Sequence, residues 1–305
     1  MRRVYQQLAQ ISAASASSST TNSPAAAARR KTFPTGIKLL HDAQSSAVDI
    51  ILIHGLTGHS EKTWTANGAA TPWPQTLLPR TIPNARVLTF GYDAYITDWR
   101  DMVSEDRIRK HSMNLLTAIA TYRANDNTAY RPIVFVCHGL GGLVCQAALQ
   151  RASTNIEEHL RQIQGLIRGI VFLGTPHHVY ALTQWAQILA RFIGVLEQID
   201  AGIAAALKSD SEVLTRIQDS FQNLSFTYGI RFAFFYEEVH LPGVGIVVAA
   251  HEAVPLGVIP TGIRSNHMDM TKFKDENDPG FVAVTGEIRR WVDYITERRQ
   301  RALYY

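Results

Sequence analysis

The chain has 305 residues, 46% of them hydrophobic and 18% charged, which is enough apolar material to bury one sizeable core. Its formal charge of +4 comes from residues 1–31, which are basic; residues 32–305 carry 25 basic and 26 acidic side chains. Because the rest of the chain has no basic excess, we expect no nucleic-acid partner. Two cysteines exclude a disulfide framework, and the lack of any run of 18 uncharged apolar residues excludes a membrane-spanning helix.

Residues 1–31 are rich in Ser and Ala, hold five basic residues and no acid, and lack the apolar block of a secretory signal. This composition is typical of a mitochondrial transit peptide. A second interpretation is a disordered, low-complexity extension, because such a segment cannot bury enough surface to offset its ordering entropy. We expect an intracellular protein, mitochondrial on the first interpretation and cytoplasmic on the second, with residues 32–305 as its folded domain.

From Thr35 onward, short β-rich runs alternate with helical patterns, which predicts an α/β fold with a mostly parallel sheet and helices on both faces. Several of the runs are continuously apolar, as expected of strands covered on both faces. The expected strands are Ile37–Leu40, Val48–Ile53, Val87–Phe90, Ile133–Cys137, Gly169–Leu173, Arg231–Tyr236 and Ile246–Ala249. The expected helices are Arg107–Arg123, Leu140–Arg151, Thr183–Leu196 and Phe281–Arg301.

The segment Ile133-Val-Phe-Val-Cys-His-Gly-Leu-Gly-Gly-Leu-Val144 is an apolar strand that runs through a tight glycine-rich turn into a helix. This is the context of a nucleophile elbow, in which a strained residue projects its side chain over the sheet edge. The expected pattern is small-x-Ser-x-Gly-Gly, and Gly139 occupies the serine position. A phosphate-binding loop is the alternative, but the turn has no Gly-Lys-Ser/Thr ending and no G-x-G-x-x-G spacing. We expect neither a cofactor nor a metal ion.

The segment Ile51-Leu-Ile-His-Gly-Leu-Thr-Gly58 ends the preceding core strand. In an α/β-hydrolase this loop supplies one backbone N–H of the oxyanion hole, and the residue after the nucleophile supplies the other. The expected donors are therefore Leu56 and Leu140. His54 precedes the turning glycine directly, so we interpret it as a residue that braces the loop rather than as a catalytic base.

In this fold the nucleophile is followed first by an acid, after a later strand, and then by a histidine near the C-terminus. Glu237 and Glu238 follow the strand that ends at Tyr236, and His267 lies in a polar loop after the last expected strand. The order predicts His267 as the base and Glu237 as the acid, with Glu238 as its rival.

A helical cap insertion is expected at about 178–222, where this fold usually carries its cap. An amphipathic stripe recurs there at helical spacing. The stripe indicates either a cap helix packed on the body or a lid that contacts a membrane at the entrance of an acyl pocket; a polar face short of Lys and Arg weakens the second interpretation. Its residues are Trp185, Ile188, Leu189, Phe192, Ile193 and Leu196.

Several motifs in this order resemble the serine-active-site-containing hydrolase family and the hydrolase domains at the N-terminus of fungal NLR-type receptors. The resemblance covers about Val48 to Phe273. Its motifs are Leu52-Ile-His-Gly-Leu, Lys62-Thr-Trp64, Arg86-Val-Leu-Thr-Phe-Gly-Tyr-Asp93, His138-Gly-Leu-Gly-Gly-Leu-Val144, Phe172-Leu-Gly-Thr-Pro-His177, Phe235-Tyr-Glu237 and Asn266-His-Met-Asp-Met270.

This resemblance implies a lipase- or esterase-like α/β-hydrolase with an acyl-ester or phospholipid ligand, Glu237 as triad acid and His267 as triad base. Where the family pattern has His-Ser-Leu-Gly-Gly, the chain has Gly139 in place of the serine. Three interpretations stay open: a lipid- or acyl-ester-binding protein with impaired catalysis, a non-catalytic interaction or signalling module with protein partners of unknown kind, and an active serine hydrolase whose serine was changed to Gly139.

Overall fold

The computed structural model describes residues 35–56, 58–94, 105–178, 188, 211–255 and 257–303. A seven-stranded sheet in the order β1-β3-β2-β4-β5-β6-β7 forms the centre of this part. Strand β1 pairs antiparallel with β3, and all the other neighbours are parallel. The strands are β1 (Gly36–His41), β2 (Val48–Ile53), β3 (Ala85–Gly91), β4 (Ile133–His138), β5 (Ile167–Leu173), β6 (Arg231–Glu237) and β7 (Thr261–Ile263).

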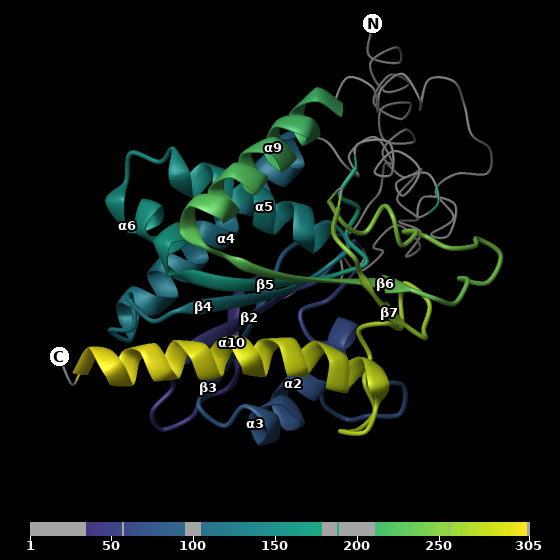
Figure 1. Cartoon of the computed structure of the whole chain (residues 1–305), viewed down its shortest axis with the longest axis horizontal. Helices are drawn as coiled ribbons and strands as arrows, with labels where there is room; N and C mark the ends of the chain where they lie inside the picture. The colour runs from purple at the N-terminus through teal and green to yellow at the C-terminus, as the bar shows by residue number, and fades with distance from the viewer. Residues whose placement is uncertain are drawn as a thin grey trace, which may run out of the picture. The chain divides into compact units, whose positions relative to one another are not determined.

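Helices cover both faces of the sheet (Figure 1). One face carries α4 (Glu105–Asn125), α5 (Leu140–Ser153), α6 (Glu158–Arg161) and α9 (Ser211–Tyr228), and the other carries α2 (Trp73–Thr76), α3 (Leu78–Thr81) and α10 (Pro279–Leu303). Short 3₁₀ turns lie at Lys62–Trp64 and Gln162–Leu166. Together, the strand order, the two helical layers and the turn from β4 into α5 are those of the α/β-hydrolase fold, as the sequence predicted.

The alternation of side chains along each strand divides the core into two layers. In β4, Phe135 and Cys137 belong to the cluster beneath α4, α5 and α9, whereas Val134 and Val136 belong to the cluster beneath α10. Because successive strand residues point to opposite faces, a run of apolar residues without polar interruption is what a strand covered on both sides requires. The continuous apolar runs in the sequence are therefore explained by the helices that cover both faces of the sheet.

A buried ionic cluster lies at the amino ends of β2, β3 and β4. Asp49 accepts two hydrogen bonds from Arg86, at 2.8 Å from Nε and 2.9 Å from Nη2, and a third from Arg131 at 3.1 Å. Arg123 approaches the same carboxylate at 3.6 Å, and Arg86 also pairs with Asp126. Asp49 is fully buried. Because three guanidinium groups surround it, the cluster ties the loop after α4 to the sheet.

Six of the expected strands are confirmed, but the one expected at Ile246–Ala249 is wrong, because the last strand is β7 at Thr261–Ile263. The amides of Val247 and Val248 donate to the carboxylate of Glu237 instead of to a neighbouring strand. Both side chains are buried, which explains why the stretch resembles a strand in the sequence.

Helix α9 was not anticipated from the sequence. It begins inside the stretch assigned to the cap, and its Ile217 and Phe221 are buried in the core cluster that includes α5. The helix expected at Thr183–Leu196 lies outside the described residues except for Ile188, which packs against the same cluster. The 1–31 tail also lies outside them. Among the helices of the described part, none is both long and apolar enough to cross a bilayer.

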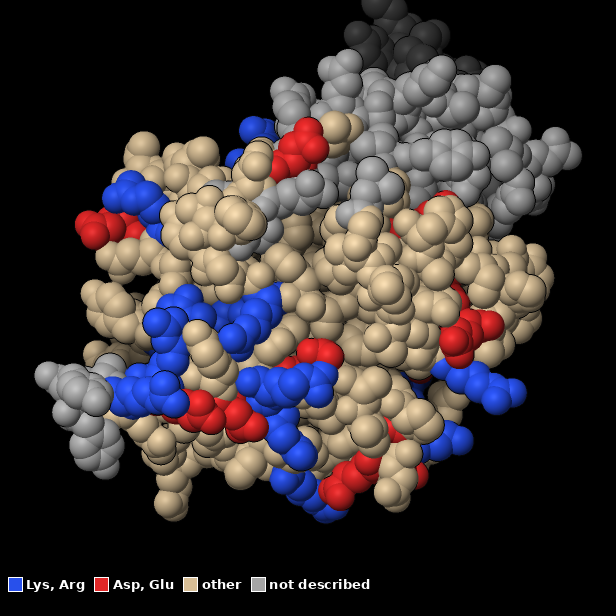
Figure 2. All heavy atoms as spheres, viewed as in Figure 1, with Lys and Arg blue, Asp and Glu red and all other residues tan. Residues whose placement is uncertain are grey.

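Charged side chains of both signs share the face shown in Figure 2. Basic groups gather over α10 and the neighbouring strand ends, with acidic groups among them. Tyr294 of α10 packs beneath two of the basic residues, with the guanidinium carbon of Arg231 3.9 Å and that of Arg298 5.5 Å from its ring centre. These contacts hold two cations against an aromatic face.

Candidate active site

Gly139 forms the turn between β4 and α5 and has φ +48° and ψ −119°. A residue with a side chain adopts this conformation only with strain, which is the usual state of a nucleophile at an elbow. Two contacts hold the turn: the Gly139 amide donates to the Leu173 carbonyl at 3.0 Å, and the Thr175 hydroxyl donates to the Gly139 carbonyl at 3.1 Å. The backbone thus has the geometry of an elbow although the side chain of a nucleophile is missing.

The glycine pair after the elbow allows α5 to approach its neighbours closely. A Cβ added to Gly141 would lie 2.5 Å from the carbonyl oxygens of Ile53 and His54, and one added to Gly142 would overlap the side chain of Thr175. Any larger residue would therefore push α5 away from the loop that follows β2. The pair keeps the first turn of α5 against the loop that carries the expected oxyanion donors.

Leu56 and Leu140 lie on these two adjoining segments, and both are buried. Leu140 is the first residue of the 14-residue helix α5, where backbone N–H groups have no acceptor within the helix. Among the bonds formed by the described residues, neither the Leu56 nor the Leu140 amide is a donor. Free amides at the positive end of a helix are suited to stabilise a developing oxyanion.

The structure brings His267 and Glu237 together. His267 Nδ1 lies 3.4 Å from Glu237 Oε2, a long contact between two side chains that are both buried. The other carboxylate oxygen accepts the amides of Val247 at 2.7 Å and Val248 at 2.6 Å. Glu238 is exposed and follows the last residue of β6, so the carboxylate in contact with His267 is that of Glu237.

His267 also lies against the elbow. His138, the residue before Gly139, donates its Nε2–H to the carbonyl of His267 at 3.0 Å, and the two ring centres are 4.8 Å apart. A Cβ on Gly174 would lie 2.8 Å from Cε1 and Nδ1 of His267, so the absence of a side chain there leaves room for the ring. Burial holds the pKa of His138 well below its usual range.

His54 braces the loop after β2, as expected from its place in the sequence. Its Nδ1 lies 2.9 Å from the Gly55 carbonyl, and its Nε2 accepts the Tyr92 amide at 3.3 Å. Its ring stacks on that of Tyr92 with centres 4.4 Å apart. Burial lowers the pKa of His54 to about 4, so the ring is neutral near pH 7.

Residues that the sequence analysis did not identify complete this site. The amides of Val247 and Val248 fix the acid, and the carbonyl of His267 is held by His138. The amino-acid sequence does not show which backbone groups will form such contacts, and the apolar Val247 and Val248 indicated a strand instead. Within the described ranges, no group of three or more His, Cys, Asp or Glu side chains is placed to hold a metal ion.

These features define a protein of the α/β-hydrolase fold in which a glutamate and a histidine are in contact beside an elbow that carries glycine. No protein-family model matches the chain. Protein SERAC1 of Homo sapiens is 26% identical over 277 residues, which cover 81% of this chain and 40% of that protein. Protein SERAC1 of Danio rerio is 23% identical over 251 residues, which cover 75% and 37%. The chain thus spans about two fifths of the length of these curated relatives.

Solved structures with the same fold are more distant in sequence. An inhibited esterase B from Lactobacillus rhamnosis has a TM-score of 0.44 and 10% identity, with 100% of this chain and 97% of that one covered. The NocB thioesterase domain has a TM-score of 0.42 and 11% identity, with 85% and 99% covered.

Proposed function

We propose that the chain is a lipase- or esterase-type α/β-hydrolase that binds an acyl ester but whose ester turnover is impaired by glycine at the nucleophile position. The observation that carries this proposal is the buried pair of His267 and Glu237 held beside the elbow at Gly139. A buried carboxylate fixed by two amides and aimed at a histidine is the orienting half of a catalytic triad.

In the proposed site, the amides of Leu56 and Leu140 hold the carbonyl oxygen of the ester. His267 stands ready to take a proton, and Glu237 keeps the ring in the required orientation. Without a serine hydroxyl there is no nucleophile to attack the carbonyl carbon. Loss of a triad nucleophile costs on the order of 10⁶ in rate, or about 8 kcal/mol of barrier. Binding and the oxyanion hole remain, which are worth roughly 10³ to 10⁴ over water.

Gly139→Ser tests this proposal. The variant should hydrolyse short-chain p-nitrophenyl esters well above the rate of the unsubstituted chain, and it should react with a fluorophosphonate probe, which the unsubstituted chain should not. Gly139→Ala is the matched control, because it introduces the same backbone strain without a hydroxyl. The gain should vanish in the Gly139→Ser, His267→Ala double variant. Probe labelling of the unsubstituted chain, or a crystal structure of Gly139→Ser with the serine oxygen beyond about 3.5 Å from His267 Nε2, would contradict the proposal.

The proposal also includes the class of ligand and the location of the protein in the cell. A lipid or other acyl ester is the expected ligand, with a peripheral membrane contact through the stretch at about 178–222. The basic, acid-free residues 1–31 are proposed to direct the protein to mitochondria. A fluorescent protein fused behind residues 1–31 should co-localise with a mitochondrial marker. A fusion that stays cytosolic would favour the disordered-extension interpretation instead.

A further inference from the structure

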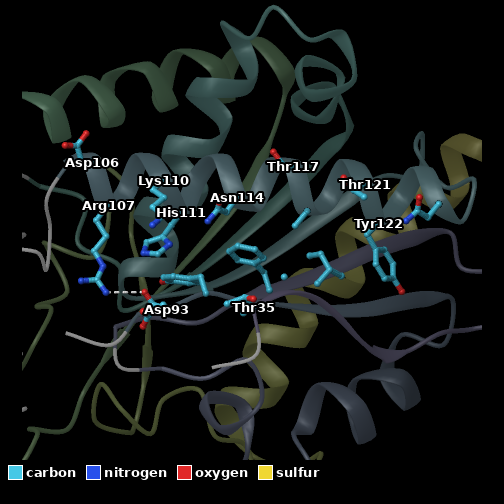
Figure 3. A pocket seen from close by; sticks show the side chains of 17 residues that line it. Thr35, Asp93, Asp106, Arg107, Lys110, His111, Asn114, Thr117, Thr121 and Tyr122 are labelled. Carbon is cyan, nitrogen blue, oxygen red and sulfur yellow. Dashed lines mark hydrogen bonds between the residues drawn. The ribbon is translucent and has the colours of Figure 1, made fainter. Parts of the chain in front are cut away.

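A cavity lies between α4, β1 and the end of β3 (Figure 3). Its volume is about 980 Å³, at the upper end of the range of small-molecule sites. None of the five positions of the candidate active site lines it. The groove follows one side of α4, from Arg107 to Tyr122, over about four turns of the helix.

A buried histidine lines this groove. His111 is only 6% exposed, and neither of its ring nitrogens has a hydrogen-bond partner among the residues that the structure describes. Figure 3 shows its ring on the groove side of α4, near Lys110 and Arg107. Leaving a buried polar group unpaired is costly, so such a group is expected to have a partner that is absent when the protein is alone.

The charges at this end of the groove favour an anion. Asp106 accepts a hydrogen bond from Arg109, with Oδ1 3.0 Å from Nη2. Arg107 donates to the backbone carbonyl of Asp93 at 3.2 Å. Burial first, and then the positive charges of Arg107 and Lys110, lower the pKa of His111 to about 4 against the weaker opposing effect of Asp93. The local field at the unpaired ring is therefore positive.

One wall of the remainder of the groove is apolar, and α4 adds the polar residues Asn114, Thr117 and Thr121 to the lining. Ile37, Ala118 and Tyr122 are half-buried against the core cluster and form its apolar wall. The ring of Tyr92, which also lines the groove, is already in contact with His54 at 4.4 Å and with His111 at 4.7 Å between ring centres. Because these contacts occupy its ring, it is a poor platform for a planar base, and a flexible chain fits better.

We propose that this groove binds a single-chain amphiphile with an anionic head group, held at Lys110 and His111, with its chain along α4 against Ile37, Ala118 and Tyr122. His111 donates its N–H to the head group, and Lys110 supplies the charge. The head group is a carboxylate, as in a fatty acid, or a phosphate, as in a lysophospholipid. This site is independent of the function proposed for the elbow.

Titration calorimetry of the full chain tests the proposal with laurate, dodecyl phosphate and dodecyltrimethylammonium, each below its micelle concentration. Laurate, dodecyl phosphate or both should bind at one site, and dodecyltrimethylammonium should not bind. Whichever anionic ligand binds identifies the head group that the groove accepts. Lys110→Ala and His111→Phe should each weaken binding at least about tenfold, whereas Arg109→Ala, a neighbouring charge outside the groove, should leave it within about twofold. Equal binding of the cation, or no effect of Lys110→Ala, would overturn the proposal.

Photo-crosslinking separates this groove from the elbow. A twelve-carbon fatty acid with a diazirine near its methyl end should label peptides within residues 35–41, 90–93 or 105–125, which line the groove. The same pattern should persist in His267→Ala, because that residue does not line the groove. Label confined to residues 138–143, or to any other segment, would overturn the groove as the binding site. The fluorophosphonate test of Gly139→Ser is unaffected by either result, so the two proposals fail separately.

Discussion

Glu237 and His267 lie 30 positions apart in the chain and meet at 3.4 Å between Oε2 and Nδ1. Glu237 is the last residue of β6, and His267 lies in the loop after β7. Because these two strands are parallel, their carboxyl ends, and the loops that follow them, lie at the same end of the sheet. The amides of Val247 and Val248 fix the other carboxylate oxygen, so the carboxylate cannot turn away from the ring. The contact between Glu237 and His267 therefore depends on the loop that carries Val247 and Val248.

Glu237→Gln, introduced together with Gly139→Ser, should reduce kcat for ester hydrolysis by about 100-fold or more, because the amide no longer selects the correct tautomer of His267. KM should change little. Glu238→Gln in the same background is the matched control, since Glu238 is exposed, and it should retain full activity. The measurement is steady-state hydrolysis of p-nitrophenyl butyrate. A larger loss from Glu238→Gln than from Glu237→Gln would reassign the acid.

The sequence predicted the sheet and the elbow because their signals are local. Continuous apolar strands and the turn from Cys137 to Gly142 follow from residues that are neighbours in the chain. The choice between Glu237 and Glu238 could not be made there, because it depends on which of two adjacent side chains points inward at the end of β6. The stretch Ile246–Ala249 was misread because burial of its side chains produces the same apolar pattern as a strand.

The groove along α4 could not be predicted from the sequence either. His111 and Lys110 lie on an ordinary amphipathic helix, and nothing in the spacing shows that β1 leaves space beside them. The cavity arises from the distance between α4 and the edge of the sheet, a property of tertiary packing. Sequence patterns indicate which residues face the core but do not indicate how completely a helix covers its neighbours.

Gly139→Ser should destabilise the fold by about 1–3 kcal/mol, because a residue with a Cβ must adopt φ near +48°. Gly139→Ala should cost a similar amount, which identifies the backbone as the cause. Gly165→Ser is the control: a Cβ there meets nothing within 4 Å, and its φ is not in the left-handed region. Urea unfolding followed by circular dichroism measures the three differences. Equal stability of Gly139→Ser and the unsubstituted chain would mean that the elbow is not strained.

Asp49→Asn should destabilise the protein by about 3–5 kcal/mol, because it leaves Arg86, Arg123 and Arg131 around a neutral side chain in a buried site. Asp106→Asn, which removes one member of an exposed ion pair on α4, should cost less than about 1 kcal/mol. Both values come from denaturant unfolding at pH 7. A loss below about 1 kcal/mol for Asp49→Asn would show that water reaches the cluster.

The last prediction concerns pH and His54, whose pKa burial lowers from 6.5 to about 4. The unfolded chain binds a proton at His54 below about pH 6.5, whereas the folded chain does not until about pH 4. Because the unfolded state binds more protons in that window, the free energy of unfolding falls as the pH is lowered from 6.5 to 4. Between pH 7 and pH 5 the contribution of this residue is about 2 kcal/mol.

His54→Gln removes the titrating ring and retains both an acceptor for the Tyr92 amide and a donor for the Gly55 carbonyl. The variant should therefore lose about 2 kcal/mol less than the unsubstituted chain between pH 7 and pH 5, whatever its stability at pH 7. His159→Gln, a replacement of an exposed histidine, should leave the pH dependence unchanged. Urea unfolding at several pH values gives both slopes. Parallel curves for His54→Gln and the unsubstituted chain would mean that His54 is already protonated in the folded protein at pH 5, and that the loop after β2 is open to water.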